Sequence, residues 1–129
     1  ERAVPDEVAH AWERLLSTSG SVSVADLARE TGWSSRHLGN RFRTEIGLSP
    51  KEAARVVRFD HARRLLQATA GTGSRARIAE LAVACGYYDQ AHLARDFRSL
   101  AGCPPSTWLA EEFRNVQADP AGSAARSSP

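Results

Sequence analysis

The sequence of 129 residues contains no methionine and only two cysteines, Cys85 and Cys103. Two cysteines cannot build a disulfide framework, and they are too few for a cysteine-type zinc site. We therefore expect reduced packing residues and no metal ion. We also predict no cofactor and no enzymatic activity. Because methionine is absent and the first residue is Glu1, we expect a fragment or processed piece of a longer protein.

Long hydrophobic runs are also missing. No segment approaches the roughly 18 consecutive apolar residues of a membrane-spanning helix, and no signal-peptide pattern is present. The composition, 42% hydrophobic and 25% charged, is that of an ordinary soluble protein. These absences favour a cytoplasmic protein without membrane contact, and the length favours one compact domain or two very small ones.

A strong excess of one charge is missing too, since the net charge is only +2. The distribution is uneven, because sixteen of the seventeen basic residues are arginine and residues 34–64 hold eight basic residues against three acids. The eight are Arg36, Arg41, Arg43, Lys51, Arg55, Arg58, Arg63 and Arg64. A basic segment of this kind fits either a nucleic-acid surface or a solvated helix face, so by itself it decides neither.

An internal repeat organises the chain. A shift of 54 residues places Ala25, Leu27, Ala28 and Gly32 on Ala79, Leu81, Ala82 and Gly86. One extra residue near Asp89 changes the shift to 55, which then places His37, Leu38, Phe42, Arg43, Gly47 and Pro50 on His92, Leu93, Phe97, Arg98, Gly102 and Pro105. Ten identities in this order indicate two copies of one structural unit.

Apolar periodicity and capping residues predict an all-α fold of about seven helices. Each copy reads as a helix, a glycine turn and a second helix, and a long helix from Ser49–Pro50 to Ala68 joins the copies. We expect four segments: residues 1–48 with an N-terminal helix and the first unit, a linker helix at 49–70, the second unit at 71–115 starting near Arg77, and a disordered tail at 116–129.

A helix-turn-helix unit can place its second helix in the major groove of DNA. On a helical wheel Leu38 and Phe42 lie opposite Arg36, Gly39, Asn40 and Arg43, and Leu93 and Phe97 lie opposite Ala91, Ala94, Arg95 and Arg98. The outward faces are small or basic, which suits close approach to DNA. The linking helix, about 30 Å long, is close to the roughly 34 Å repeat of the duplex, so two such helices could enter successive grooves.

The second copy carries a more specific pattern, and by it the chain resembles the DNA-binding region of AraC/XylS-type transcription regulators. The family signature is matched at Ile78, Ala79, Cys85, Gly86, Tyr87, Asp89, Gln90, Arg95, Phe97, Arg98, Gly102 and Pro105. The resemblance covers about residues 20–112. It implies a seven-helix fold with two helix-turn-helix units, which often forms the output half of an effector-sensing protein.

The resemblance also implies roles for individual residues. Bases would be read by Arg36, Gly39 and Asn40 in the first unit and by Gln90, Ala91 and Arg95 in the second; the expected phosphate contacts are Ser35, His37, Arg43 and Arg98. The chain departs from the family pattern where Gly39 replaces a longer polar residue, and where Trp108 and Leu109 replace a tyrosine and an arginine.

These observations predict a sequence-specific double-stranded DNA-binding domain of a bacterial transcription regulator. Its further partners would be an N-terminal effector-sensing domain outside this chain and RNA polymerase. The alternative is a helical protein-interaction module that has lost productive DNA reading, which the small face around Gly39 motivates. For His37 and His92 we favour packing or phosphate contact over catalysis, because no nucleophile or metal constellation accompanies them.

Overall fold

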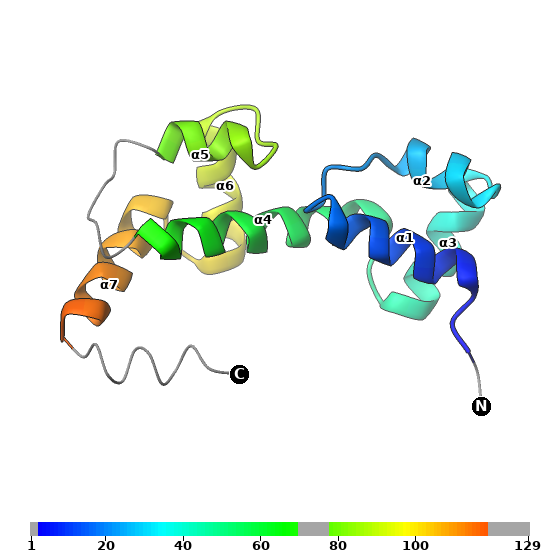
Figure 1. Ribbon diagram of the computed structural model, residues 1–129, viewed down its shortest axis with the longest axis horizontal. Helices are drawn as coiled ribbons and strands as arrows, with labels where there is room; N and C mark the ends of the chain where they lie inside the picture. The colour runs from blue at the N-terminus through cyan, green and yellow to red at the C-terminus, as the bar shows by residue number, and fades with distance from the viewer. Residues whose placement is uncertain (1–2, 70–77, 119–129) are drawn as a thin grey trace. The chain divides into compact units, whose positions relative to one another are not determined.

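A computed structural model of the protein describes residues 3–69 and 78–118 (Figure 1). All regular secondary structure in these two ranges is α-helical, as the sequence predicted. The seven helices are α1 (Asp6–Ser17), α2 (Val24–Thr31), α3 (Ser35–Ile46), α4 (Pro50–Thr69), α5 (Ile78–Ala84), α6 (Gln90–Ala101) and α7 (Pro105–Ala118).

Short-range capping explains where several of these helices begin and end. The side chain of Ser34 accepts a hydrogen bond from the backbone N–H of His37, and that of Asp89 accepts one from His92. Gly47 and Gly102 end α3 and α6 in the left-handed conformation, with φ of 93° and 84°. Because these signals are local, a few neighbouring residues are enough to specify where the helices begin and end.

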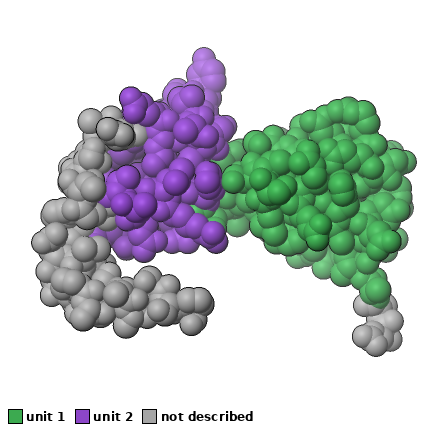
Figure 2. Space-filling model, viewed as in Figure 1, with its two compact units in different colours: residues 1–60 green, residues 61–129 purple. Residues whose placement is uncertain are grey.

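The chain divides into two compact units, residues 1–60 (unit 1) and residues 61–129 (unit 2), which Figure 2 colours separately. The division falls inside α4, between Asp60 and His61. Ala53 and Ala54 of α4 are buried in unit 1, and Ala62 and Leu66 are buried in unit 2. From the sequence we expected residues 49–70 to form a separate linker helix between the two units, and this division of the chain stays a prediction.

Unit 1 packs α1, α2 and α3 around a core of fully buried aliphatic side chains and Phe42. Trp12 covers this core, with its ring centroid 6.4 Å from that of Phe42. On α1 the residues Val8, Ala11 and Leu15 are buried, whereas the side chain of Leu16 is 50% exposed.

Unit 2 has a core of its own, built from the buried residues Ala62, Leu66, Ile78, Ala82, Cys85, Tyr87, Leu93, Phe97 and Leu109. The ring of Phe97 on α6 meets Trp108 on α7 at 5.8 Å between centroids, in an edge-on arrangement. Both cysteines are free thiols; Cys85 is buried and Cys103 half-buried. Burial raises the pKa of the Cys85 thiol, which therefore behaves as an apolar packing group.

The internal repeat of the sequence is present in the helix boundaries. A shift of 54 residues carries the start of α2 onto the start of α5, and a shift of 55 carries both ends of α3 onto both ends of α6. The same shift carries Pro50, the first residue of α4, onto Pro105, the first residue of α7. Each copy therefore consists of a turn between two helices and the start of a third helix.

Two sequence expectations concern the ends of elements. Residues 116–118 are helical, whereas irregular structure was predicted from residue 116; α7 continues because the chain from Pro105 to Ala118 contains no glycine or further proline. The rest of that tail, residues 119–129, and the expected start of the second copy near Arg77 lie outside the described residues.

Candidate nucleic-acid interface

In unit 1 the candidate interface is the outer face of α3. Leu38 and Phe42 are completely buried, and they attach the opposite face of the helix to the core. Arg36, Asn40 and Arg43 are exposed, and Gly39 between them is half-buried. These four positions follow the i, i+3, i+4, i+7 pattern of a helix and so lie on one face of it. The wheel prediction of an inner apolar face and an outer small or basic face is confirmed.

Unit 2 repeats this arrangement on α6. Leu93 and Phe97 are completely buried. The exposed residues are Gln90, Ala91, Arg95 and Arg98, with Ala94 half-buried among them. Each outer face carries two arginines and one amide side chain, but the first arginine of α3 is the second residue of that helix, whereas the first arginine of α6 is its sixth residue. The predicted residues are thus grouped within each unit, and their contacts with DNA remain predictions.

The two predicted phosphate contacts at the start of α3 are both exposed. Ser35 is the first residue of the helix, and His37 lies two positions later. The ring of His37 packs against Trp33 at 4.4 Å between centroids. His37 therefore has a packing contact already, while its exposed edge can still meet solvent or a phosphate.

Tyr88 was not singled out by the sequence, although it occupies the extra position of the second copy. Its side chain is 87% exposed, and it directly precedes Asp89, which caps α6. The backbone N–H of Tyr88 donates to Nδ1 of His92 at 3.2 Å. The one-residue shift in the repeat was the sequence signal that marked this position.

Three arginines of α4 are less exposed than the arginines on the outer faces of α3 and α6. Arg55, Arg58 and Arg63 are half-buried, and each takes part in at least one interaction within the protein. The sequence could not separate a DNA-lining role from a solvated one. Their intermediate burial does not separate a DNA-lining role from a solvated one, and the question stays open.

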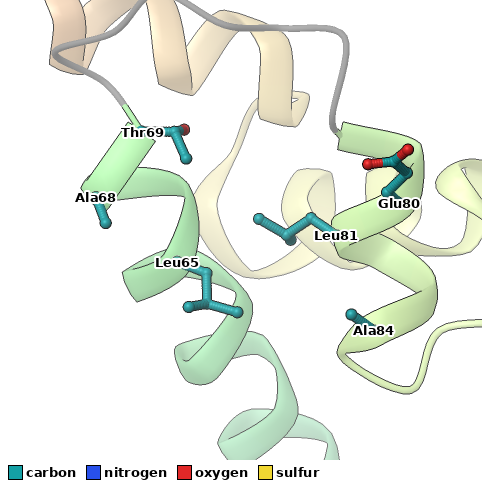
Figure 3. A pocket seen from close by; sticks show the side chains of 6 residues that line it. All are labelled: Leu65, Ala68, Thr69, Glu80, Leu81 and Ala84. Carbon is teal, nitrogen blue, oxygen red and sulfur yellow. The ribbon is translucent and has the colours of Figure 1, made fainter.

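Unit 2 also contains a shallow apolar pocket of about 380 Å³ between α4 and α5. Leu65 of α4 and Leu81 of α5 point toward each other across it, and Glu80 lies at its edge (Figure 3). It contains none of the sequence-predicted site residues. Within the described ranges, no cluster of three or more histidine, cysteine or acidic residues could hold a metal ion.

Two capped helix-turn-helix units, each with a buried inner face and an exposed basic outer face, define the class of helix-turn-helix proteins. Residues 27–111 match the family model described as a helix-turn-helix domain. The chain therefore belongs to the AraC-type helix-turn-helix family, the DNA-binding domains of transcription regulators, and this is not a family of enzymes.

Individual relatives agree with this assignment. The HTH-type transcriptional regulator GlxA of Rhizobium meliloti (strain 1021) is 34% identical over 105 residues, which are 81% of this chain and 29% of that protein. The chain thus spans less than a third of the length of this relative. Within residues 3–69 and 78–118, none of the helices is both long and apolar enough to cross a membrane.

Solved structures show the same fold. A probable AraC family transcriptional regulator from Rhodopseudomonas palustris CGA009 is 28% identical, with a TM-score of 0.70 over 84% of this chain and 98% of that chain. The C-terminal domain of AraT, a response regulator from Geobacillus stearothermophilus, also has a TM-score of 0.70, over 88% of each chain. At 19% identity this second likeness concerns the fold alone.

Proposed function

We propose that the protein binds double-stranded DNA in a sequence-specific manner and inserts α3 and α6 into successive major grooves. The observation that carries this proposal is the duplicated outer face, on which arginines stand exposed opposite fully buried leucine and phenylalanine. A helix with one buried and one basic exposed face is suited to the negatively charged groove. The length of α4, 20 residues or about 30 Å, supports the two-groove part of the proposal.

Within this proposal the residues have separate roles. Arg36 and Asn40 on α3, and Gln90 and Arg95 on α6, read base edges, because arginine pairs with guanine and an amide side chain pairs with adenine. Gly39 and Ala91 allow close approach, and Ala91 can contact a thymine methyl group. Ser35, His37, Arg43 and Arg98 contact phosphates, which position the helices without reading sequence.

We further propose that the chain is the output part of a longer bacterial regulator. The relative GlxA is more than three times the length of the matched region, which is consistent with an additional effector-sensing domain. RNA polymerase is a further partner in this proposal, and the site of action is the cytoplasm, where the bacterial chromosome lies.

The alternative function is a protein-interaction module that keeps the helical fold without reading DNA. Its support is the outer face of α3, where Gly39 offers no side chain. A titration of duplex binding against salt separates the two. A DNA-binding domain that neutralises several phosphates shows log K falling steeply as log salt rises, whereas the alternative predicts no duplex binding even at low salt.

Selection of bound sites from random duplexes completes the test. Enrichment of a site with two conserved blocks about one helical turn apart would support reading by both units. Enrichment of one block would restrict sequence reading to one unit. Binding without any enrichment would contradict sequence specificity and leave only electrostatic attachment to DNA.

A further inference from the structure

Arg43, one of the proposed phosphate contacts, already has an acidic neighbour. Its Nη2 atom lies 3.3 Å from Oε1 of Glu52, and the two side chains are 61% and 53% exposed. Both residues belong to unit 1, Arg43 in the last turn of α3 and Glu52 in the first turn of α4. The positive charge that α3 would present to a phosphate is therefore partly compensated within the protein.

Glu52 is held in place by more than this ion pair. Its Oε1 accepts the backbone N–H of Ser49 at 2.8 Å, and the Oγ of Ser49 accepts the backbone N–H of Glu52 at 3.1 Å. This reciprocal pair is a capping box at the start of α4. The hydrogen bond from the Ser49 backbone, then that from its side chain, and then the charge of Arg43 lower the pKa of the Glu52 carboxyl. Glu52 is consequently an anchored anion at neutral pH.

The second copy lacks this anion. The shift of 55 residues carries Arg43 onto Arg98, Ser49 onto Pro104 and Glu52 onto Thr107. Arg98 is exposed, and no ion pair to it appears in the part of the chain that the structure describes. The two units thus carry equivalent arginines at the ends of α3 and α6, but only the first arginine faces a carboxylate fixed by a helix cap.

We propose that Glu52 weakens the attachment of unit 1 to DNA by competing with phosphate for Arg43. A phosphate that reaches Arg43 must either displace the carboxylate or bind beside it, and two like charges at this distance repel each other. The capping hydrogen bonds keep Glu52 from moving away freely. Unit 2, where Arg98 has no ion pair among the described residues, then supplies the larger share of phosphate binding. This inference rests on the proposed DNA-binding function.

The variant Glu52→Gln tests the proposal, because the glutamine amide oxygen can still accept the Ser49 N–H while the charge is removed. The matched control is Glu13→Gln, which changes net charge equally at an exposed residue of α1 with no ion pair among the described residues. Each protein of 129 residues is titrated with a random-sequence duplex over a range of salt concentrations. Circular dichroism confirms that the helical content is unchanged.

We expect Glu52→Gln to bind the random duplex about two- to five-fold more tightly than Glu13→Gln at equal low salt. The slope of log K against log salt should also steepen by about one unit, since one more cation becomes available to phosphate. Affinity equal to or below that of Glu13→Gln would overturn the proposal. Absence of duplex binding by every protein, including the wild type, would instead overturn the DNA-binding function itself.

A second comparison, made first in the wild-type background, does not depend on the folding of the Glu52 variant. Because Arg43 is already partly neutralised, Arg43→Ala should reduce affinity for random duplex less than Arg98→Ala does. In the Glu52→Gln background, Arg43→Ala should cost more than it does in the wild type. An equal or larger loss for Arg43→Ala than for Arg98→Ala in the wild-type background would contradict competition by Glu52.

Discussion

The imidazole ring of His92 lies edge-on against the ring of Tyr87, with 4.9 Å between centroids and 86° between the planes. Trp33 and His37 form the equivalent contact in unit 1, at 4.4 Å and 62°. In each copy, the aromatic residue that follows the turn glycine packs on a histidine in the first turn of the next helix. This contact holds the turn against the helix and gives both histidines a packing role.

The first prediction concerns Arg95, the proposed base reader of α6. Arg95→Ala should cost about 1 to 3 kcal/mol on a selected target duplex and relax the preference at one base pair, because a bidentate contact to guanine is lost. Arg98→Ala should weaken binding to target and random duplexes about equally. Binding titrations with both duplexes measure this. An equal loss on both duplexes for Arg95→Ala would reassign it as a phosphate contact.

Gly39 allows a prediction about stability that is independent of DNA. A Cβ atom at this helical position meets no heavy atom within 4 Å. Gly39→Ala should therefore increase the free energy of unfolding by about 0.5 to 1 kcal/mol, since alanine loses less backbone entropy in a helix. Denaturant unfolding followed by circular dichroism provides the value. A decrease would show that the open space around this position is filled in solution.

The pair Gly39→Gln and Gly39→Glu tests whether this face of α3 meets DNA. The two side chains have nearly the same size, but only glutamate adds a negative charge. If α3 lies in the groove, Gly39→Glu should bind duplex DNA much more weakly than Gly39→Gln, because its carboxylate faces phosphates. Equal affinities of the two variants would place the interface elsewhere on unit 1.

Gly20 supports a prediction of severe destabilisation. This glycine has φ of +81°, and a Cβ atom would lie 2.4 Å from the carbonyl oxygen of Ala54 on α4. Gly20→Ala should cost about 2 to 5 kcal/mol, from left-handed strain together with overpacking. Gly32→Ala is the control: φ is +77°, but a Cβ meets nothing within 4 Å. Similar thermal midpoints for the two variants would rule out the close approach at Gly20.

Glu30 makes the stability of unit 1 dependent on pH. It accepts hydrogen bonds from Arg14 at 3.0 Å and pairs with His10 at 2.7 Å, which together lower its pKa from 4.5 to about 2. Because the pKa of Glu30 is lower in the folded state than in the unfolded state, the ionised carboxylate stabilises the folded state at pH values above the unfolded-state pKa. This contribution is lost as the pH falls from about 4.5 to about 2. The free energy of unfolding should decrease across this range more in the wild type than in Glu30→Gln. A carboxyl titration of Glu30 by NMR with a midpoint near 4.5 would contradict the prediction.

Much of the fold could be predicted because its signals are short-range. Ser34 and Asp89 lie at the caps, and Gly47 and Gly102 end the helices, so the boundaries of α3 and α6 follow from a few neighbouring residues. The inner and outer faces of these helices follow from the 3.6-residue period, since leucine and phenylalanine four residues apart must share one side. Because the two copies share one pattern, the boundaries and faces predicted for α3 also applied to α6.

Other features depend on residues that are distant in the sequence or that compete for the same space. Leu16 is apolar and directly follows the buried Leu15 on α1, but its side chain is 50% exposed. Asp96 is 6% exposed on α6, although a carboxylate there would be expected on the surface. The close approach of Gly20 to Ala54 likewise joins two segments that are far apart in the sequence, so the sequence pattern could not predict it.

The sequence by itself determined an all-α chain, its two helix-turn-helix copies, and the residues that face outward on α3 and α6, because helix periodicity, capping and turn glycines act over a few positions. Only the tertiary structure decided which of those outward charges have neighbours. Arg43 lies beside Glu52 because the turn after α3 brings the capped start of α4 back to it, whereas the second copy has Thr107 in place of Glu52 and so offers Arg98 no carboxylate at that position. That proximity depends on where two helices meet, and no periodicity within either helix specifies it.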